Sequence, residues 1–343
     1  HITDNDRSPR SGHSAFYDKG RPPMNNLIYS LNATMPVFLV ILIGYILNRL
    51  GMFNEGFISA SNKFIFNVCL PVMVFADLAK ENIIESFNGS LVIYSAVITT
   101  IAFAVIWICA KLFIKDKTII GAFVQAAYRS SVAVMGFAFM QNIYGSSGLI
   151  PMIIIGCVPL YNIYAVTVLT FEAEDAQNDP DKKNKLKKAA VGIIKNPIII
   201  GIITGCIGSL LNVYSFIPPI MDKTLSSLAA IATPLSLIVI GASFEGKKAI
   251  AKIKPTAVCC AVKLIGMPLV FLSAAVLMGF RDEALLALII MLGSPTTPSC
   301  YIMAKNMKND GVLTSSVIAA TTLLSSVTLT FWIFIAKHLG YIS

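Results

Sequence analysis

The chain has 343 residues, of which 56% are hydrophobic and only 13% are charged. Soluble domains carry about 25% charged residues, so this composition excludes an ordinary soluble protein. The hydrophobic residues form long blocks such as LVIYSAVITTIAFAVIWICA (Leu91 to Ala110), and a helix needs about 20 apolar residues to cross a bilayer. The sequence therefore predicts an all-α membrane protein with several spans.

Histidines and cysteines exclude the commonest catalytic and metal sites. The three histidines, His1, His13 and His338, lie near the two ends of the chain, and no two of the seven cysteines form a CxxC pair. The cysteines all fall in hydrophobic blocks, where they are expected to act as small apolar side chains. No nucleophile–base pair is visible either, so we expect neither an enzyme nor a metal or other cofactor.

Residues 1–23 are polar and precede Met24. We interpret them as a remnant foreign to the native protein, and a short native disordered tail is the alternative. From Met24 on, ten spans are predicted. They cover approximately 26–48, 57–79, 90–113, 118–141, 147–171, 191–211, 217–243, 255–279, 283–304 and 312–336.

One long polar loop divides the spans into two sets of five. FEAEDAQNDPDKKNKLKK begins at Phe171, and it predicts a first repeat over 24–171, a loop over 172–190 and a second repeat over 191–343. Loops and span ends after odd-numbered spans hold seventeen Lys and Arg residues, against four on the other side. Because basic residues favour the cytoplasmic side, we expect both native termini outside a plasma membrane. The net charge of +9 is spread over five loops, so it indicates topology rather than nucleic-acid binding.

The two halves repeat one another in order. Pro36 matches Pro197 and Gly44 matches Gly205, both 161 positions later. Pro71 matches Pro234 after 163 positions, and Asn142 matches Asn306 after 164. A repeat of five spans must enter the membrane upside down relative to its copy. Inverted repeats with interrupted helices are typical of secondary transporters, whose site lies at the midplane.

Two spans carry residues that interrupt a helix. Span nine contains GSPTTPSC, and its counterpart in span four is YRSSVAVMGFAF. A proline removes a helix hydrogen bond, and hydrocarbon offers no water as a substitute. We predict breaks near Val134–Gly136 and near Pro295–Pro298, with the two spans crossing at mid-membrane.

Three stretches resemble the auxin efflux carrier family, which includes the plant PIN auxin carriers and bacterial malate and malonate permeases. They are GYILNRLGMFNEGFISASNKFIFNVCLPVMVF, VMGFAFMQNIYG and AKNMKNDGVLTSSVIAA. The resemblance covers the chain from Met24 to its end. It implies ten helices in two inverted bundles of five, with helices one, two, six and seven as a scaffold and the rest as a mobile, elevator-like transport domain.

The sequence departs from the plant members at two positions. Ser131 stands where they have Asn, and Ala138 where they have Pro. The resemblance therefore does not carry over an auxin-type carboxylate site built on that Asn, and the crossing in span four would depend on Gly136.

Arg129 is the foremost candidate for the site, since a charge about 15 Å into a span must face protein or water. It either binds a carboxylate of the substrate in a bidentate manner or satisfies carbonyls of the broken span nine. The other candidate substrate-binding residues cluster at the two matched breaks: Ser130, Ser131, Val134, Met135, Gly136, Ser294, Pro295, Thr296, Thr297, Pro298 and Ser299.

Two further charges are candidates for coupling. Lys263 lies about eight residues into span eight, where its long stem either snorkels to the cytoplasmic face or takes part in transport. Asp77 lies near the outer end of span two as an interfacial charge or a coupling group.

The function expected is secondary transport of small organic anions. Sodium-coupled transport of amphipathic solutes or amino acids, and a membrane sensor without transport, are the alternatives. The expected partners are the anion and the lipid bilayer. A coupling ion (Na⁺ or H⁺) and a homodimer through the scaffold helices stay open.

Overall fold

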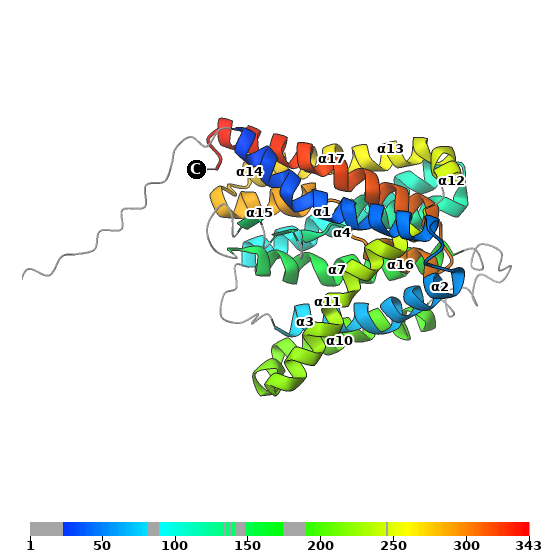
Figure 1. Ribbon diagram of the computed structural model, residues 1–343. Helices are drawn as coiled ribbons and strands as arrows, with labels where there is room; N and C mark the ends of the chain where they lie inside the picture. The colour runs from blue at the N-terminus through cyan, green and yellow to red at the C-terminus, as the bar shows by residue number, and fades with distance from the viewer. Residues whose placement is uncertain are drawn as a thin grey trace, which may run out of the picture.

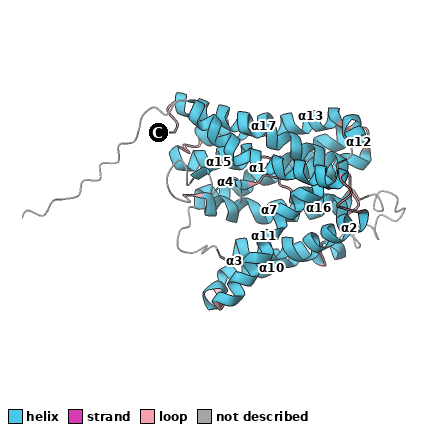
Figure 2. Ribbon diagram, viewed as in Figure 1, coloured by secondary structure: helices cyan, strands magenta, loops and turns pink. Residues whose placement is uncertain are grey.

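The computed structural model describes residues 23–80, 89–132, 135–136, 139–140, 148–173, 190–244 and 246–342. Within these residues the regular structure is entirely helical and contains no strand (Figure 2). Predictions that concern residues 1–22, the loop 174–189, Val134, Ala138 and Asn142 lie outside the described residues. The all-helical architecture confirms the fold class at this level.

Figure 1 labels the main helices of the described residues. In chain order they are α1 (Pro23–Arg49), α2 (Glu55–Phe64), η1 (Ile65–Cys69), α3 (Leu70–Ala79), α4 (Gly89–Phe113), η2 (Lys117–Ile119), α5 (Ile120–Tyr128), α7 (Ile150–Phe171), α10 (Pro197–Leu210), η3 (Val213–Phe216), α11 (Pro219–Ala242), α12 (Gly246–Ala251), α13 (Ile253–Ala261), η4 (Val262–Gly266), α14 (Met267–Leu277), α15 (Asp282–Gly293), α16 (Ser299–Asn306) and α17 (Gly311–His338).

Within the described part of the chain, six helical stretches are long and apolar enough to cross a membrane. They fall on predicted spans two, three, five, seven, eight and ten: Glu55–Ala79, Gly89–Phe113, Ile150–Phe171, Pro219–Ala242, Ile253–Leu277 and Gly311–His338. Shorter apolar helices stand at spans one and six, Met35–Arg49 and Pro197–Leu210. Spans four and nine are interrupted.

Helix α4 shows which solvent these helices face. Its exposed large side chains recur every three or four residues and so form one stripe: Ile93, Val97, Ile101, Val105, Ile108 and Leu112. Its opposite face is buried and includes Tyr94, Ser95 and Thr99. An outward apolar stripe with polar groups turned inward is the arrangement of a helix that faces lipid.

Glycines bring helices from the two halves of the chain into close contact. A Cβ at Gly44 of α1 would overlap the backbone of Ile238 in α11. In the same way, a Cβ at Gly205 of α10 would crowd the backbone of Phe75 in α3. In Figure 1, α3 and α10 lie together at the lower edge of the molecule, with α17, α13 and α14 at the opposite edge.

Two spans contain a π-helical turn immediately before a proline. η1 precedes Pro71, and η4 precedes Pro268. A proline lacks the N–H that would bond the carbonyl four residues earlier, so that carbonyl needs another donor. For Pro268 the carbonyl is that of Leu264, and Trp332 Nε1 of α17 donates to it at 3.0 Å. The π turn is thereby anchored to a neighbouring helix.

Candidate functional site

The chain leaves the helix of span four at Arg129. Helix α5 ends at Tyr128, and Arg129 adopts an extended conformation with φ −75° and ψ 146°. The predicted position of this break, Val134–Gly136, is therefore wrong by about five residues, since Met135 and Gly136 are helical and buried. Without a proline in span four, a distant contact fixes the break: the N–H of Ser131 donates to the carbonyl of Pro295 at 3.0 Å.

The break in span nine lies where the prolines predict it. Helix α15 ends at Gly293, Ser294 is extended with φ −64° and ψ 150°, and α16 begins at Ser299. We call Arg129–Ser131 and Ser294–Pro298 together the crossing. Its two segments come from opposite halves of the chain and bond to one another.

Side chains bond to carbonyls in the helices that border the crossing. Thr296 Oγ1 donates to the carbonyl of Ala126 at 2.7 Å, and Gln125 Nε2 donates to the carbonyl of Cys300 at 2.8 Å. The N–H of Thr296 in turn donates to Thr321 Oγ1 of α17 at 3.1 Å. These buried bonds replace the water that hydrocarbon lacks, so Thr296 braces the crossing.

Arg129 is buried at the crossing, with 3% of its surface exposed. Its Nη1 donates to Met303 Sδ at 2.8 Å, and its Nη2 donates to Asn162 Oδ1 at 3.0 Å and to Ser299 Oγ at 3.2 Å. All three acceptors are neutral, and a thioether is a weak acceptor. Among the described residues, no carboxylate forms an ion pair with this guanidinium.

Further polar atoms near Arg129 are buried without a hydrogen-bond partner in the described structure. They are four groups that can donate, Arg129 Nε, Ser130 Oγ, Tyr161 Oη and Lys263 Nζ, and one acceptor, Gln125 Oε1. Such buried unpaired groups are rare, and each one calls for an explanation. The surroundings of the crossing thus offer more donors than the protein itself uses.

Lys263 lies in η4 and is 0% exposed, so its Nζ does not reach the membrane surface. Snorkelling, one of the two interpretations of this residue, is therefore wrong. The π turn that carries Lys263 packs against α5, α15 and α17. Those contacts place Lys263 beside the first halves of both broken spans.

The remaining candidates take different positions. Ser294 Oγ donates at 2.5 Å to the carbonyl of Ile290 in α15, the helix that precedes it, and Thr297 Oγ1 lies 3.3 Å from Ser299 Oγ. Pro295 and Pro298 are buried parts of the crossing backbone. Asp77 lies on α3, which packs chiefly against α10 and α11.

Asn162 and Tyr161 are candidate site residues that the sequence analysis missed. Both lie in the middle of α7, and the mid-span Asn was the available signal. Asn162 Nδ2 donates to the carbonyl of Val158 at 3.0 Å, which turns its Oδ1 towards Arg129.

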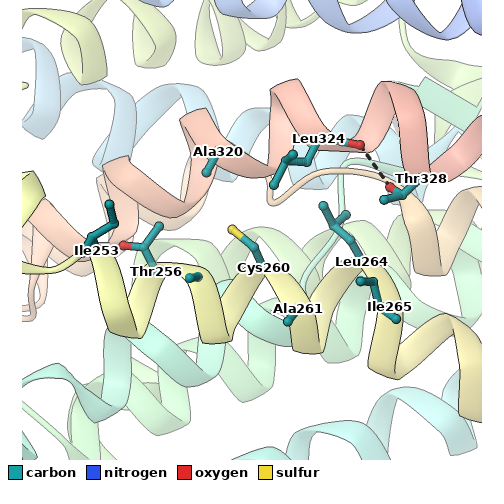
Figure 3. A pocket seen from close by; sticks show the side chains of 10 residues that line it. Ile253, Thr256, Cys260, Ala261, Leu264, Ile265, Ala320, Leu324 and Thr328 are labelled. Atoms are coloured by element: carbon teal, nitrogen blue, oxygen red, sulfur yellow. Dashed lines mark hydrogen bonds between the residues drawn. The ribbon is translucent and has the colours of Figure 1, made fainter.

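An apolar pocket of about 390 Å³ lies elsewhere, between α13–η4 and α17 (Figure 3). None of its ten lining residues is charged: Ile253, Thr256, Ala257, Cys260, Ala261, Leu264, Ile265, Ala320, Leu324 and Thr328. The pocket has no cation for a carboxylate and includes no residue of the crossing. Over the described residues, no three His, Cys, Asp or Glu side chains come together as a metal site.

Comparison with known proteins agrees with this architecture. Residues 29–333 match the family described as "Membrane transport protein". The "Uncharacterized transporter YfdV" of Escherichia coli (strain K12) is 22% identical over 91% of this chain and 99% of its own length. An "Uncharacterized transporter" of Methanothermobacter thermautotrophicus is 23% identical over 88% of this chain and 97% of its own.

A third relative carries a substrate in its name. The "Putative malonate transporter" of Rhizobium meliloti is 23% identical over 88% of this chain and 94% of its own length. These relatives are named as transporters and not as enzymes. The chain therefore belongs to the membrane transport protein family, the auxin efflux carrier family that its sequence resembles, and is a multi-pass membrane transporter.

Proposed function

We propose that the chain is a secondary transporter of small organic anions, which it moves across the plasma membrane by alternating access. The observation that carries the proposal is the buried Arg129, whose guanidinium has only neutral acceptors in the described structure. A charge taken out of water is costly unless an opposite charge pairs with it. A carboxylate of the substrate supplies that charge.

The neighbouring groups suit the same ligand. Ser299, which accepts from Arg129, is the first residue of α16. The N–H groups of Cys300 and Tyr301 already donate to the carbonyls of Thr297 and Pro298, but the partial positive charge at a helix N-terminus still stabilises an anion. The hydroxyls of Ser130 and Tyr161, which lie near each other, add further donors. A carboxylate at the crossing could therefore exchange its hydration shell for protein donors.

The packing of the glycines supports two inverted repeats of five helices. Gly44 and Gly205 are matched positions of the two halves, and their contacts Ile238 and Phe75 differ by the same 163 residues as Pro71 and Pro234. Each half thus inserts its first span against the second span of the other half. The proposed scaffold consists of these four spans, and the proposed transport domain carries the crossing.

The substrate class rests on Arg129 and on the relative that is named for malonate. Tracer flux tests it directly. Purified protein in liposomes is expected to take up labelled malonate, or to exchange it for an internal carboxylate, and unlabelled carboxylates should compete where amino acids do not. A protein that binds none of a panel of mono- and dicarboxylates in a thermal-shift screen would refute the proposal. Binding without flux would instead favour a sensor.

A further inference from the structure

Lys263 is a second buried basic residue, and the role proposed for Arg129 does not account for it. It is 0% exposed, and its Nζ has no hydrogen-bond partner in the described structure. An ammonium in that position lacks both water and an anion, which is the most costly state for a lysine. Lys263 must therefore either give up its proton or acquire an anionic partner.

The groups around Lys263 offer no such partner. η4 packs against α13, α14, α15, α17 and α5. The carboxylates on these helices, Asp282 and Glu283, stand in the first turn of α15, about 15 Å along the helix from its end at Gly293.

The other titratable and charged groups are neutral, cationic or distant. The thiols of Cys157, Cys259 and Cys300 lie within electrostatic range of Lys263, and Cys300 also lies within range of Arg129. Helix α5 contributes the phenol of Tyr128 and leads into Arg129. α13 further carries Lys254 and Cys260, while Lys337 and His338 stand in the last turn of α17; α14 has no titratable side chain.

We propose that Lys263 carries the coupling proton: it is a neutral amine in the empty site and takes up one proton when the anion binds. This inference rests on the proposed function and adds its coupling ion. The anion gives the ammonium the partner it lacks, so anion and proton stabilise each other's binding by the same free energy. The proton enters from the side that the anion enters, bonds to Nζ, and leaves with the anion on the other side.

The consequence is a proton count that can be measured. Malonate binding is followed by calorimetry at alkaline pH, where both malonate carboxylates are ionised, in buffers that differ in their heat of ionisation. The wild-type protein is expected to take up about one proton per bound malonate. Lys263→Met, of similar length without the amine, and Lys263→Arg, which stays charged, are both expected to take up none. The matched control is Lys254→Met, which removes an exposed lysine of the same span and should leave the count unchanged.

The outcomes separate the coupling from the function. A wild-type protein that binds malonate without proton uptake, or Lys263 variants that keep the wild-type count, would overturn the inference and leave anion transport standing. If no carboxylate binds at all, the proposed function and the inference both fail. Should Lys263→Met fail to fold, the wild-type count and Lys263→Arg still decide. In liposomes, the Lys263 variants should lose accumulation of the anion driven by a pH gradient, while Lys254→Met should keep it.

Discussion

Replacing Arg129 by Lys separates substrate binding from bracing of the crossing. The guanidinium makes three hydrogen bonds, to Met303, Asn162 and Ser299, and still has Nε unpaired. Lysine keeps the charge, but it has a single nitrogen and cannot reproduce the planar fork of donors. The variant therefore removes bidentate recognition without removing the positive charge.

The two roles predict different magnitudes in different measurements. If a carboxylate binds Arg129, its affinity should fall by roughly ten- to a hundred-fold, because a hydrogen bond to a charged group contributes about 1.5–3 kcal/mol. The protein should also lose about 1–3 kcal/mol of stability, since two bonds to neutral acceptors at about 0.5–1.5 kcal/mol each are given up. A loss of affinity is expected only if Arg129 binds the substrate, whereas a loss of stability is expected in either role.

The assay measures the thermal midpoint and malonate affinity on the same preparations. The control is Thr321→Val, which disturbs only the bracing of the crossing. It removes the acceptor of the Thr296 N–H and leaves the donors of Arg129 in place. Thr321→Val should lower the thermal midpoint and keep near-normal affinity. If Arg129→Lys behaves like this control, with lowered stability and unchanged affinity, Arg129 braces the crossing and does not bind the substrate.

Three further changes test the packing, the ion pairs and the orientation. Gly241→Leu should separate α11 from the carbonyl of Ile41 in α1 and lower the stability by about 1–3 kcal/mol or more. Gly246→Ala is the control and should leave the stability unchanged, because a Cβ there would meet nothing within 4 Å. Equal thermal midpoints for the two variants would contradict this packing. A hydrogen bond from Thr118 and the ammonium of Lys252 lower the pKa of Asp116 from 3.8, and these bonds outweigh the opposing effect of burial. Stability from the pair with Asp116 is present above 3.8 and lost as pH falls through the lowered pKa. Lys252 Nζ also lies 3.2 Å from Asp310 Oδ2, so Lys252→Met breaks two ion pairs and should cost up to about 2 kcal/mol at neutral pH and nothing in acid strong enough to protonate both carboxylates; an undiminished effect there would refute it. A cysteine in place of Lys183, in the loop 172–190, should resist impermeant thiol reagents added to intact cells, and ready labelling would reverse the predicted topology.

The hydrophobic pattern was enough to predict an all-helical membrane protein and the positions of its long helices. The six long helices fall on predicted spans because a helix in lipid must be apolar over its whole length, and that requirement is local in sequence. The break in span nine was also predictable from local sequence, because Pro295 and Pro298 each remove a helix hydrogen bond there. Arg129 was identified as a site candidate because a mid-span charge stands out against apolar neighbours.

Tertiary structure decided the features that depend on partners far along the chain. The break in span four has no proline, and its place at Arg129–Ser131 follows from a backbone bond to Pro295. Lys263 could have reached the surface by length alone, but α5, α15 and α17 cover the turn that carries it. Asn162 became part of the site only because α7 brings its oxygen to Arg129. A sequence records which residues are costly in a membrane, while the packing of distant helices determines which of them remain unpaired.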